Sequence, residues 1–175
     1  VLPSTPIDGD AIGSALATYL VLKKLKKSVT VVCAEPIPDL LRFLPETQVI
    51  GDKLVSSKDF IVTIDTREIK VDEIKSNIEE NKVNIIISPK EGRFTENQIT
   101  FNEGLDEYDL IITVDTADLQ QLRQIYTENT QMFHEIPVIN IDHHISNEHY
   151  GKINCVDIMS ASATELLLPL FERME

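Results

Sequence analysis

Short runs of apolar, mostly β-branched residues alternate along this chain with stretches whose apolar residues recur every three or four positions. Residues 11–27 place four apolar residues on one face, a spacing that predicts an amphipathic helix: Ile12, Leu16, Tyr19 and Leu20. Uninterrupted apolar runs of this kind are typical of buried strands. They cover residues 29–33, 60–64, 110–114 and 138–141. The alternation predicts an α/β domain with a mostly parallel sheet flanked by helices.

Three further helices are expected from local signals. A short helix over residues 39–43 should end before Pro45, and another should follow the strand at 110–114. The last begins at Ser162, because Ser162-Ala163-Thr164-Glu165 has the capping-box pattern. Pro169 falls inside this helix, and its missing N–H group predicts a kink there.

Residues 70–102 differ from the rest of the chain in their pattern of charged and apolar residues. A charged helical stretch is expected over residues 72–81, followed by a strand at 83–87. From Lys90 to Phe101 polar and apolar residues alternate around Gly92, which favours an antiparallel ribbon. We therefore interpret residues 70–102 as an inserted helix and β-ribbon within a single domain of residues 1–175.

Composition narrows the range of partners. Sixteen basic against twenty-nine acidic residues give a net charge of −13 at pH 7, which argues against binding to long duplex nucleic acid. Cys33 and Cys155 are too few for a disulfide framework, and the sequence shows neither a signal peptide nor a membrane span. These features predict a cytoplasmic protein without membrane association. Its 175 residues suit one packed core.

Acidic residues follow several of the expected strands. They are Asp8 and Asp10 near the start of the chain, Asp65, Asp115, and Asp142 with His143 and His144. In open parallel sheets the carboxyl ends of the strands form the edge at which ligands bind. Carboxylates that converge there repel one another unless a cation lies among them. The set predicts a metal-dependent phosphoester site, with Asp142-His143-His144 as its most informative part.

A structural role could explain some of these residues individually. Asp10 and Asp115 each precede an expected helix, where a carboxylate caps free N–H groups and suits the helix dipole. Asp65 has charged neighbours and is interpreted as part of a solvated turn, while His134 and His149 have no acidic cluster near them in the sequence. The functional interpretation therefore depends on the acids acting together.

The motifs resemble the N-terminal domain of the DHH phosphoesterase superfamily. They are Asp8-Gly9-Asp10-Ala11-Ile12-Gly13-Ser14, then Asp115, then Asp142-His143-His144. The Gly-Ser-Ala-Leu-Ala start of the first helix and the segment 162–165 resemble, within it, the bifunctional oligoribonucleases and 3′-phosphoadenosine-5′-phosphate phosphatases. The resemblance covers most of the chain apart from about residues 70–102.

This resemblance implies a hydrolase with two Mn²⁺ ions and a bridging water that becomes the nucleophile. Four residues would bind the ions: Asp115 as the bridge, Asp8 for one ion, and Asp10 with His143 for the other. His144 would contact the substrate phosphate, Ser14 would also bind substrate, and Asp142 would orient the histidines. The implied substrates are short oligonucleotides, cleaved as by an exonuclease, or small phosphorylated nucleotides.

Two features depart from the family pattern. Ser4 stands where the family has a histidine, and serine is a poor ligand, so the ion served by Asp8 should bind weakly. The family's last metal-binding aspartate and its C-terminal substrate-binding domain have no counterpart before Glu175, and Asp157 is interpreted as structural. We therefore expect a domain truncated at both ends, the N-terminal end because the chain opens on Val1.

The departures leave alternative functions open. One is a catalytically degenerate domain that binds a nucleotide or a protein partner. Two others lie in the same superfamily, inorganic pyrophosphatase and cyclic-dinucleotide phosphodiesterase activity. A homodimer is compatible with each of them. A dinucleotide-binding dehydrogenase is disfavoured, because no Gly-x-Gly-x-x-Gly follows the first strand.

Overall fold

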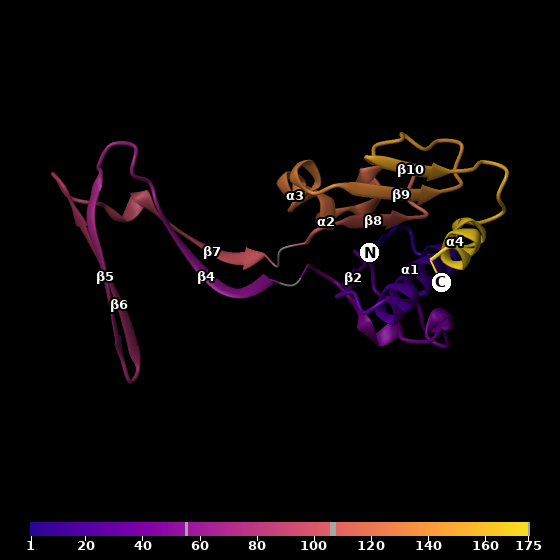
Figure 1. The fold of residues 1–175 in the computed structure, drawn as a ribbon, viewed down its shortest axis with the longest axis horizontal. Coiled ribbons are helices and arrows are strands. Elements are labelled where there is room, and N and C mark those ends of the chain that lie inside the picture. Colours follow the sequence, from indigo (N-terminus) through magenta and orange to yellow (C-terminus); the bar gives the residue numbers. More distant parts are fainter. Residues whose placement is uncertain (55, 106–107, 175) are drawn as a thin grey trace. The chain divides into compact units, whose positions relative to one another are not determined.

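The chain divides into two compact units (Figure 1). A computed structural model describes residues 1–54, 56–105 and 108–174. The first unit combines Val1–Val55 with Glu107–Glu175, and the second is Ser56–Asp106. The second unit is therefore an insertion between the two halves of the first. No helix in the part of the chain that the structure describes is long and apolar enough to cross a membrane.

A four-stranded parallel sheet forms the centre of the first unit, in the order β1-β8-β9-β10. Its strands are β1 (Leu2–Pro3), β8 (Ile111–Val114), β9 (Val138–Asp142) and β10 (Ile153–Val156). The strands expected at 110–114 and 138–141 are confirmed as β8 and β9, which supports the predicted α/β class. The edge strand β10 was not predicted, because Asn154 interrupts its short apolar run.

Helices cover both faces of this sheet. α1 (Gly9–Lys24) and α4 (Ala163–Glu172) lie side by side on one face, where Val114 and Ile141 pack against Leu167. α2 (Gln124–Thr127) and α3 (Thr130–Glu135) cover the other face, over Ile111 and Val138. The division follows from the strand geometry, since alternate residues of β8 and β9 point to opposite faces.

The first helix is confirmed, and three of the four residues of its predicted apolar stripe are turned inward. Ile12, Leu16 and Tyr19 are buried, whereas Leu20 is exposed. The last helix is also confirmed: Ser162 is its N-cap and accepts a 3.1 Å hydrogen bond from the backbone N–H of Glu165. The Glu165 carboxylate returns to the N–H of Ala161 instead of that of Ser162, so the reciprocal half of the capping box is displaced by one residue.

The helix expected after Asp115 is split in two. A 3₁₀ turn at η4 (Leu119–Leu122) and the short α2 are separated by Arg123, whose φ of 50° does not fit a continuous helix. The helix expected over 39–43 is likewise only a 3₁₀ turn, η1 (Asp39–Leu41). Beside these, β2 (Val31–Val32) pairs in parallel with β3 (Ile50–Gly51), after the 3₁₀ turn η2 (Thr47–Val49).

The second unit consists of two antiparallel strand pairs. β4 (Ser56–Ile64) pairs with β7 (Ile99–Leu105), and β5 (Val71–Glu79) pairs with β6 (Lys82–Pro89). The 3₁₀ turn η3 (Glu96–Gln98) precedes β7. The strand expected at 83–87 is confirmed as part of β6.

Two predictions for this region are wrong. The helix expected at 72–81 is the strand β5: Ile74 and Ile78 are four residues apart, a spacing that fits one face of either a helix or a strand. The run 60–64 belongs to β4, where Ile61 and Val62 are exposed, and not to the parallel sheet. The antiparallel character expected for 90–101 is confirmed at its end, because residues 99–101 belong to β7, which pairs antiparallel with β4. The insertion is also wider than the expected 70–102.

Candidate metal site

The acidic and imidazole side chains gather at the carboxyl ends of two neighbouring strands. Asp115 directly follows β8, and β9 ends at Asp142, immediately before His143 and His144. The parallel register pairs Val114 with Ile141, and the N–H of Asp115 donates a 2.8 Å hydrogen bond to the Ile141 carbonyl. The strand-end rule thus correctly predicted that these segments meet.

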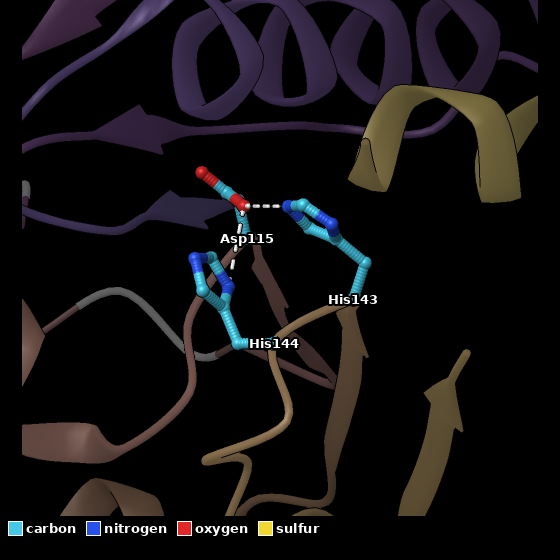
Figure 2. Close-up of side chains that lie close together, drawn as sticks. All are labelled: Asp115, His143 and His144. Carbon is cyan, nitrogen blue, oxygen red and sulfur yellow. Dashed lines mark ion pairs between the residues drawn. The ribbon is translucent and has the colours of Figure 1, made fainter. Parts of the chain in front are cut away.

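Three side chains form a group that can hold a metal ion. Asp115, His143 and His144 each offer a ligand atom, and these atoms lie within 4.8 Å of one another. Asp115 Oδ1 is 3.4 Å from His143 Nε2 and 3.7 Å from His144 Nδ1. Figure 2 shows both rings turned toward this carboxylate oxygen. His144 was expected at the substrate phosphate, but its ring also borders the metal group.

The carboxylate of Asp115 lies in an unfavourable environment for an anion. Its side chain is buried, and Oδ1 has no hydrogen-bond partner among the described residues. Burial, together with the negative charges of Asp10 and Asp8, raises the pKa of Asp115 to about 7. A φ of 55° places the residue in the left-handed region, which aspartate tolerates better than most residues. A cation beside Oδ1 would relieve both the missing partner and the charge repulsion.

Ser4 occupies the other side of Asp115. The serine is buried, and its Oγ donates a 3.4 Å hydrogen bond to Asp115 Oδ2. It therefore supports the carboxylate from the position at which the resemblance implied an imidazole. A hydroxyl is a much weaker ligand for a transition-metal ion than an imidazole nitrogen.

Asp142 orients His144. It is fully buried, and its Oδ1 lies 2.7 Å from His144 Nδ1. This hydrogen bond is the main cause that raises the pKa of His144. Asn147 Nδ2 donates a 2.6 Å hydrogen bond to the other oxygen of Asp142. When His144 donates its Nδ1 proton to Asp142, its Nε2 is left for a ligand or a phosphate.

His143 is oriented by a different group. Its Nδ1 lies 3.2 Å from the backbone carbonyl oxygen of Ser160, in the loop before α4. A carbonyl only accepts, so this contact places a proton on Nδ1 and directs Nε2 toward Asp115 and Asp10. The prediction that Asp142 orients both histidines therefore applies to His144 alone. Ser160 carries no sequence signal, because it acts through its backbone.

Asp8 is the N-cap of α1. Its Oδ1 accepts 2.9 Å hydrogen bonds from the N–H groups of Asp10 and Ala11. The alternative explanation of Asp10 as the cap of this helix is therefore wrong, because Asp8 is the cap. Because a carboxylate oxygen has two lone pairs and Asp8 Oδ2 is not used in the cap, the side chain retains acceptor capacity.

Asp10 caps the other helix, α4. Its Oδ2 accepts from the Ala163 N–H at 2.6 Å, and its Oδ1 accepts from the N–H and hydroxyl of Thr164 at 3.0 and 2.7 Å. Burial acts to raise the pKa of Asp10, but the hydrogen bonds from Thr164 and Ala163 outweigh it, and the pKa is lowered. Asp10 Oδ2 also lies 3.5 Å from His143 Nε2, so Asp10 borders the metal group.

Ser14 is placed differently from its predicted role in substrate binding. Its side chain is fully buried, and its hydroxyl lies 3.2 Å from Asp10 Oδ1 and 2.9 Å from Thr164 Oγ1. We therefore assign Ser14 to the support of Asp10. Thr164, which holds the same carboxylate, was not singled out from the sequence.

The residues interpreted as structural have structural contacts. Asp65 forms a 2.5 Å ion pair with Arg67 in an exposed turn, and this hydrogen-bonded pair lowers the pKa of Asp65 to about 2. Asp157 accepts a hydrogen bond from the Met159 N–H within its own loop. His134 and His149 are exposed. None of these residues belongs to the metal group.

Fold and site together define a class of protein. This is an α/β domain that carries a carboxylate–imidazole group, suited to a metal ion, at the carboxyl edge of a parallel sheet. The chain belongs to the DHH family: the model of the DHH family N-terminal domain matches residues 2–175. The predicted superfamily is thereby confirmed.

A solved structure has the same fold. It is an exopolyphosphatase-related protein from Bacteroides fragilis, with a TM-score of 0.62 and 20% sequence identity. The match covers 99% of this chain and 38% of that protein, so the present chain spans well under half of the relative's length. No curated protein sequence matches the chain.

Proposed function

We propose that this chain is the metal-binding domain of a hydrolase that cleaves phosphoesters of short nucleotides. The observation that carries the proposal is the buried Oδ1 of Asp115, which has no hydrogen-bond partner in the described structure and faces a nitrogen of His143 and of His144. Buried polar atoms without a partner are rare in native proteins and call for an explanation. A divalent cation at this point provides one.

The donor set fits a transition-metal ion, and we propose Mn²⁺. Carboxylate and imidazole together suit this kind of ion, whereas Mg²⁺ and Ca²⁺ prefer oxygen ligands alone. Asp115 and His143 would hold the ion, with Asp10 at its border. Asp8 would serve a second, weaker site beside Ser4. When bound, such ions activate water as a nucleophile and neutralise charge on a phosphoryl group.

The protein's own residues would hold the phosphate and keep the ligands in place. His144 can donate from Nε2 to a phosphate oxygen, and its raised pKa favours the protonated ring that such a contact needs. Asp142 would be a positioning residue that fixes this ring through Nδ1. Ser160 does the same for His143 through its carbonyl oxygen.

The substrate class is a proposal of short oligonucleotides or small phosphorylated nucleotides. Its support is the motif resemblance to oligoribonucleases and 3′-phosphoadenosine-5′-phosphate phosphatases. The net charge of −13 agrees with a small substrate held through cations and argues against a long polyanion. Inorganic polyphosphate or pyrophosphate is the competing class, to which the name of the Bacteroides fragilis relative points.

Two measurements test this function. Calorimetry with Mn²⁺ should show binding that is lost in Asp115→Asn and His143→Asn and retained in His134→Asn, which alters an exposed histidine outside the site. Hydrolysis of a dinucleotide, 3′-phosphoadenosine-5′-phosphate and pyrophosphate should then be compared with Mn²⁺ present. Activity that survives Asp115→Asn would overturn the proposal, and cleavage of pyrophosphate alone would replace its substrate class.

A second candidate is a domain that binds nucleotides without cleaving them. Ser4 favours it, because a hydroxyl stands beside Asp115 in place of a strong ligand. The variant Ser4→His separates the two functions. If the chain is an enzyme with one weak site, the added imidazole should increase the amount of Mn²⁺ bound and the rate of hydrolysis. Nucleotide binding that needs no Mn²⁺ and shows no turnover in either protein would establish the binding domain.

A further inference from the structure

The hairpin β5–β6 in the inserted unit carries an apolar face without charged residues. Its ladder pairs Ile74 with Ile87, Ser76 with Ile85 and Ile78 with Val83. Directly paired residues of an antiparallel ladder point to the same face, and this face returns every second residue. Five aliphatic side chains and one serine therefore share one side of the hairpin.

The opposite face is polar apart from Ile86, and several of its polar side chains pair within the hairpin. Lys75 forms a 2.8 Å ion pair with Glu73. Glu79 accepts hydrogen bonds from the side-chain amides of Asn77 and Asn84. These contacts confirm the alternation of the two faces, because all of their members occupy the other set of ladder positions.

The apolar face is open to solvent. Ile74 is 64% exposed, Ile78 78%, Val83 63% and Ile85 55%. β5 and β6 pair only with each other, in a two-stranded sheet within the described part of the chain. A two-stranded hairpin is at best marginally stable in water, and it needs cover on an apolar face to become independently stable. This face therefore fits an interaction surface.

We propose that this apolar face, defined by residues 74, 76, 78, 83, 85 and 87, is the interface at which two copies of the chain associate. A net charge of −13 makes two copies repel each other over most of their surfaces, whereas this face brings no charge to the contact. A charged partner, such as a basic protein or a nucleic acid, would find nothing to pair with on it.

The geometry and the area suit a symmetric pair. Two hairpins can pack face to face as in a β-sandwich, about 10 Å apart. A two-fold axis along the strands sets β5 of one copy over β6 of the other, so that the small Ser76 meets the larger Ile85. At roughly 100 Å² for each aliphatic side chain, two copies bury roughly 1,000 Å², the lower bound of a specific interface.

Two neighbouring residues offer a matched test. Ile85 and Ile86 lie on the same strand and are 55% and 53% exposed, but they point to opposite faces. Analytical ultracentrifugation of the whole chain over a range of concentrations should show a monomer–dimer equilibrium. Ile85→Lys should raise the dissociation constant at least about tenfold, while Ile86→Lys should leave it nearly unchanged. Circular dichroism of both variants checks that the hairpin still forms.

Cross-linking tests the same face without placing a charge in the hairpin. In a Cys155→Ser background, which removes the exposed native cysteine, two Ser76→Cys chains should be joined into a covalent dimer by a bismaleimide whose spacer spans about 10 Å, the separation of two packed sheets. Asn77→Cys, on the polar face, should not. A wild-type chain that stays monomeric at all concentrations overturns the proposal. That result is expected if another part of the same chain covers the apolar face. Equal effects of Ile85→Lys and Ile86→Lys also overturn it, because they indicate pairing along a strand edge.

Discussion

The carboxylate of Asp10, on α1, accepts a 2.6 Å hydrogen bond from the backbone N–H of Ala163, the first residue of α4. Helices from opposite ends of the chain are thus joined at their N-termini, directly beside His143. The free N–H groups at the start of a helix attract an anion, and here the anion comes from another helix. One side chain therefore links the packing of α1 and α4 to the border of the metal group.

Replacing Asp10 by alanine should destabilise the fold even without metal. The first turn of α4 would lose the acceptor for Ala163 and Thr164, and the loss of a cap costs about 1–2 kcal/mol. Urea unfolding in the presence of a chelator measures this cost apart from any effect on metal binding. Asp39→Ala provides the control, because that carboxylate is almost fully exposed and its removal should change the free energy of unfolding by less than about 0.5 kcal/mol.

Asp115→Asn should stabilise the metal-free protein, and more so as the pH rises. The folded pKa of Asp115, about 7, lies above the value of roughly 3.9 for an unfolded chain. The stability that the protonated carboxyl of Asp115 contributes is therefore fully present below pH 4 and is lost as the pH rises through 7. Asparagine has no such dependence and also tolerates the left-handed backbone.

Measuring the free energy of unfolding of Asp115→Asn and the wild type at two pH values tests this prediction. In chelator, the variant should exceed the wild type in free energy of unfolding by about 2–4 kcal/mol at pH 8 and by much less at pH 4. With Mn²⁺ the order should reverse, because only the carboxylate gains from the ion. A difference that does not vary with pH would contradict the burial of a charged Asp115, and Asp39→Asn controls for general charge effects.

Asp142→Asn should lower the pKa of His144. The hydrogen bond from His144 Nδ1 to Asp142 favours the charged ring, and a neutral amide would favour it much less. NMR titration of the imidazole protons measures the change, with the exposed His134 as an internal comparison within the same protein. An unchanged titration of His144 would show that Asp142 does not control its protonation. The free energy of unfolding should fall as well, because Asn147 loses a charged acceptor.

Gly151→Ala should be strongly destabilising, whereas Gly9→Ala should not. An added Cβ at Gly151 would lie 2.6 Å from the backbone oxygen of Ile153, so the chain entering β10 would have to shift. Overpacking of this kind typically costs about 1–3 kcal/mol. At Gly9, in the first turn of α1, nothing lies within 4 Å of the added atom. Thermal unfolding of the two variants, side by side, separates the steric effect from the general effect of replacing glycine.

The residues that could be found from sequence share one property: their signal is local. Asp142, His143 and His144 are adjacent in the chain, and Asp115 directly follows an apolar run. The parallel-sheet rule then brings the two strand ends together without further information. Asn147 and Ser160, which hold Asp142 and His143, were missed because one acts from a loop and the other through its backbone.

The elements of the fold also divide into those with a local sequence signal and those without one. β8 and β9 were predicted because strands buried on both faces are apolar throughout. β5 was mistaken for a helix, because Ile74 and Ile78 recur at a spacing that both structures allow. What decides in favour of a strand is the partner β6, to which β5 is hydrogen-bonded along its length. Pairing is a property of two segments, and a single segment does not encode it.

The sequence alone determined the α/β class, the family and the residues at the edge of the sheet, since apolar periodicity and contiguous motifs are local patterns. Only the tertiary structure decided what those residues contact. In the structure Asp10 caps α4 and Asp8 caps α1. Ser14 is buried against Asp10, and Asp115 Oδ1 has no hydrogen-bond partner among the described residues. Such contacts join positions up to about 150 residues apart, as between Asp10 and Thr164, and depend on how helices pack.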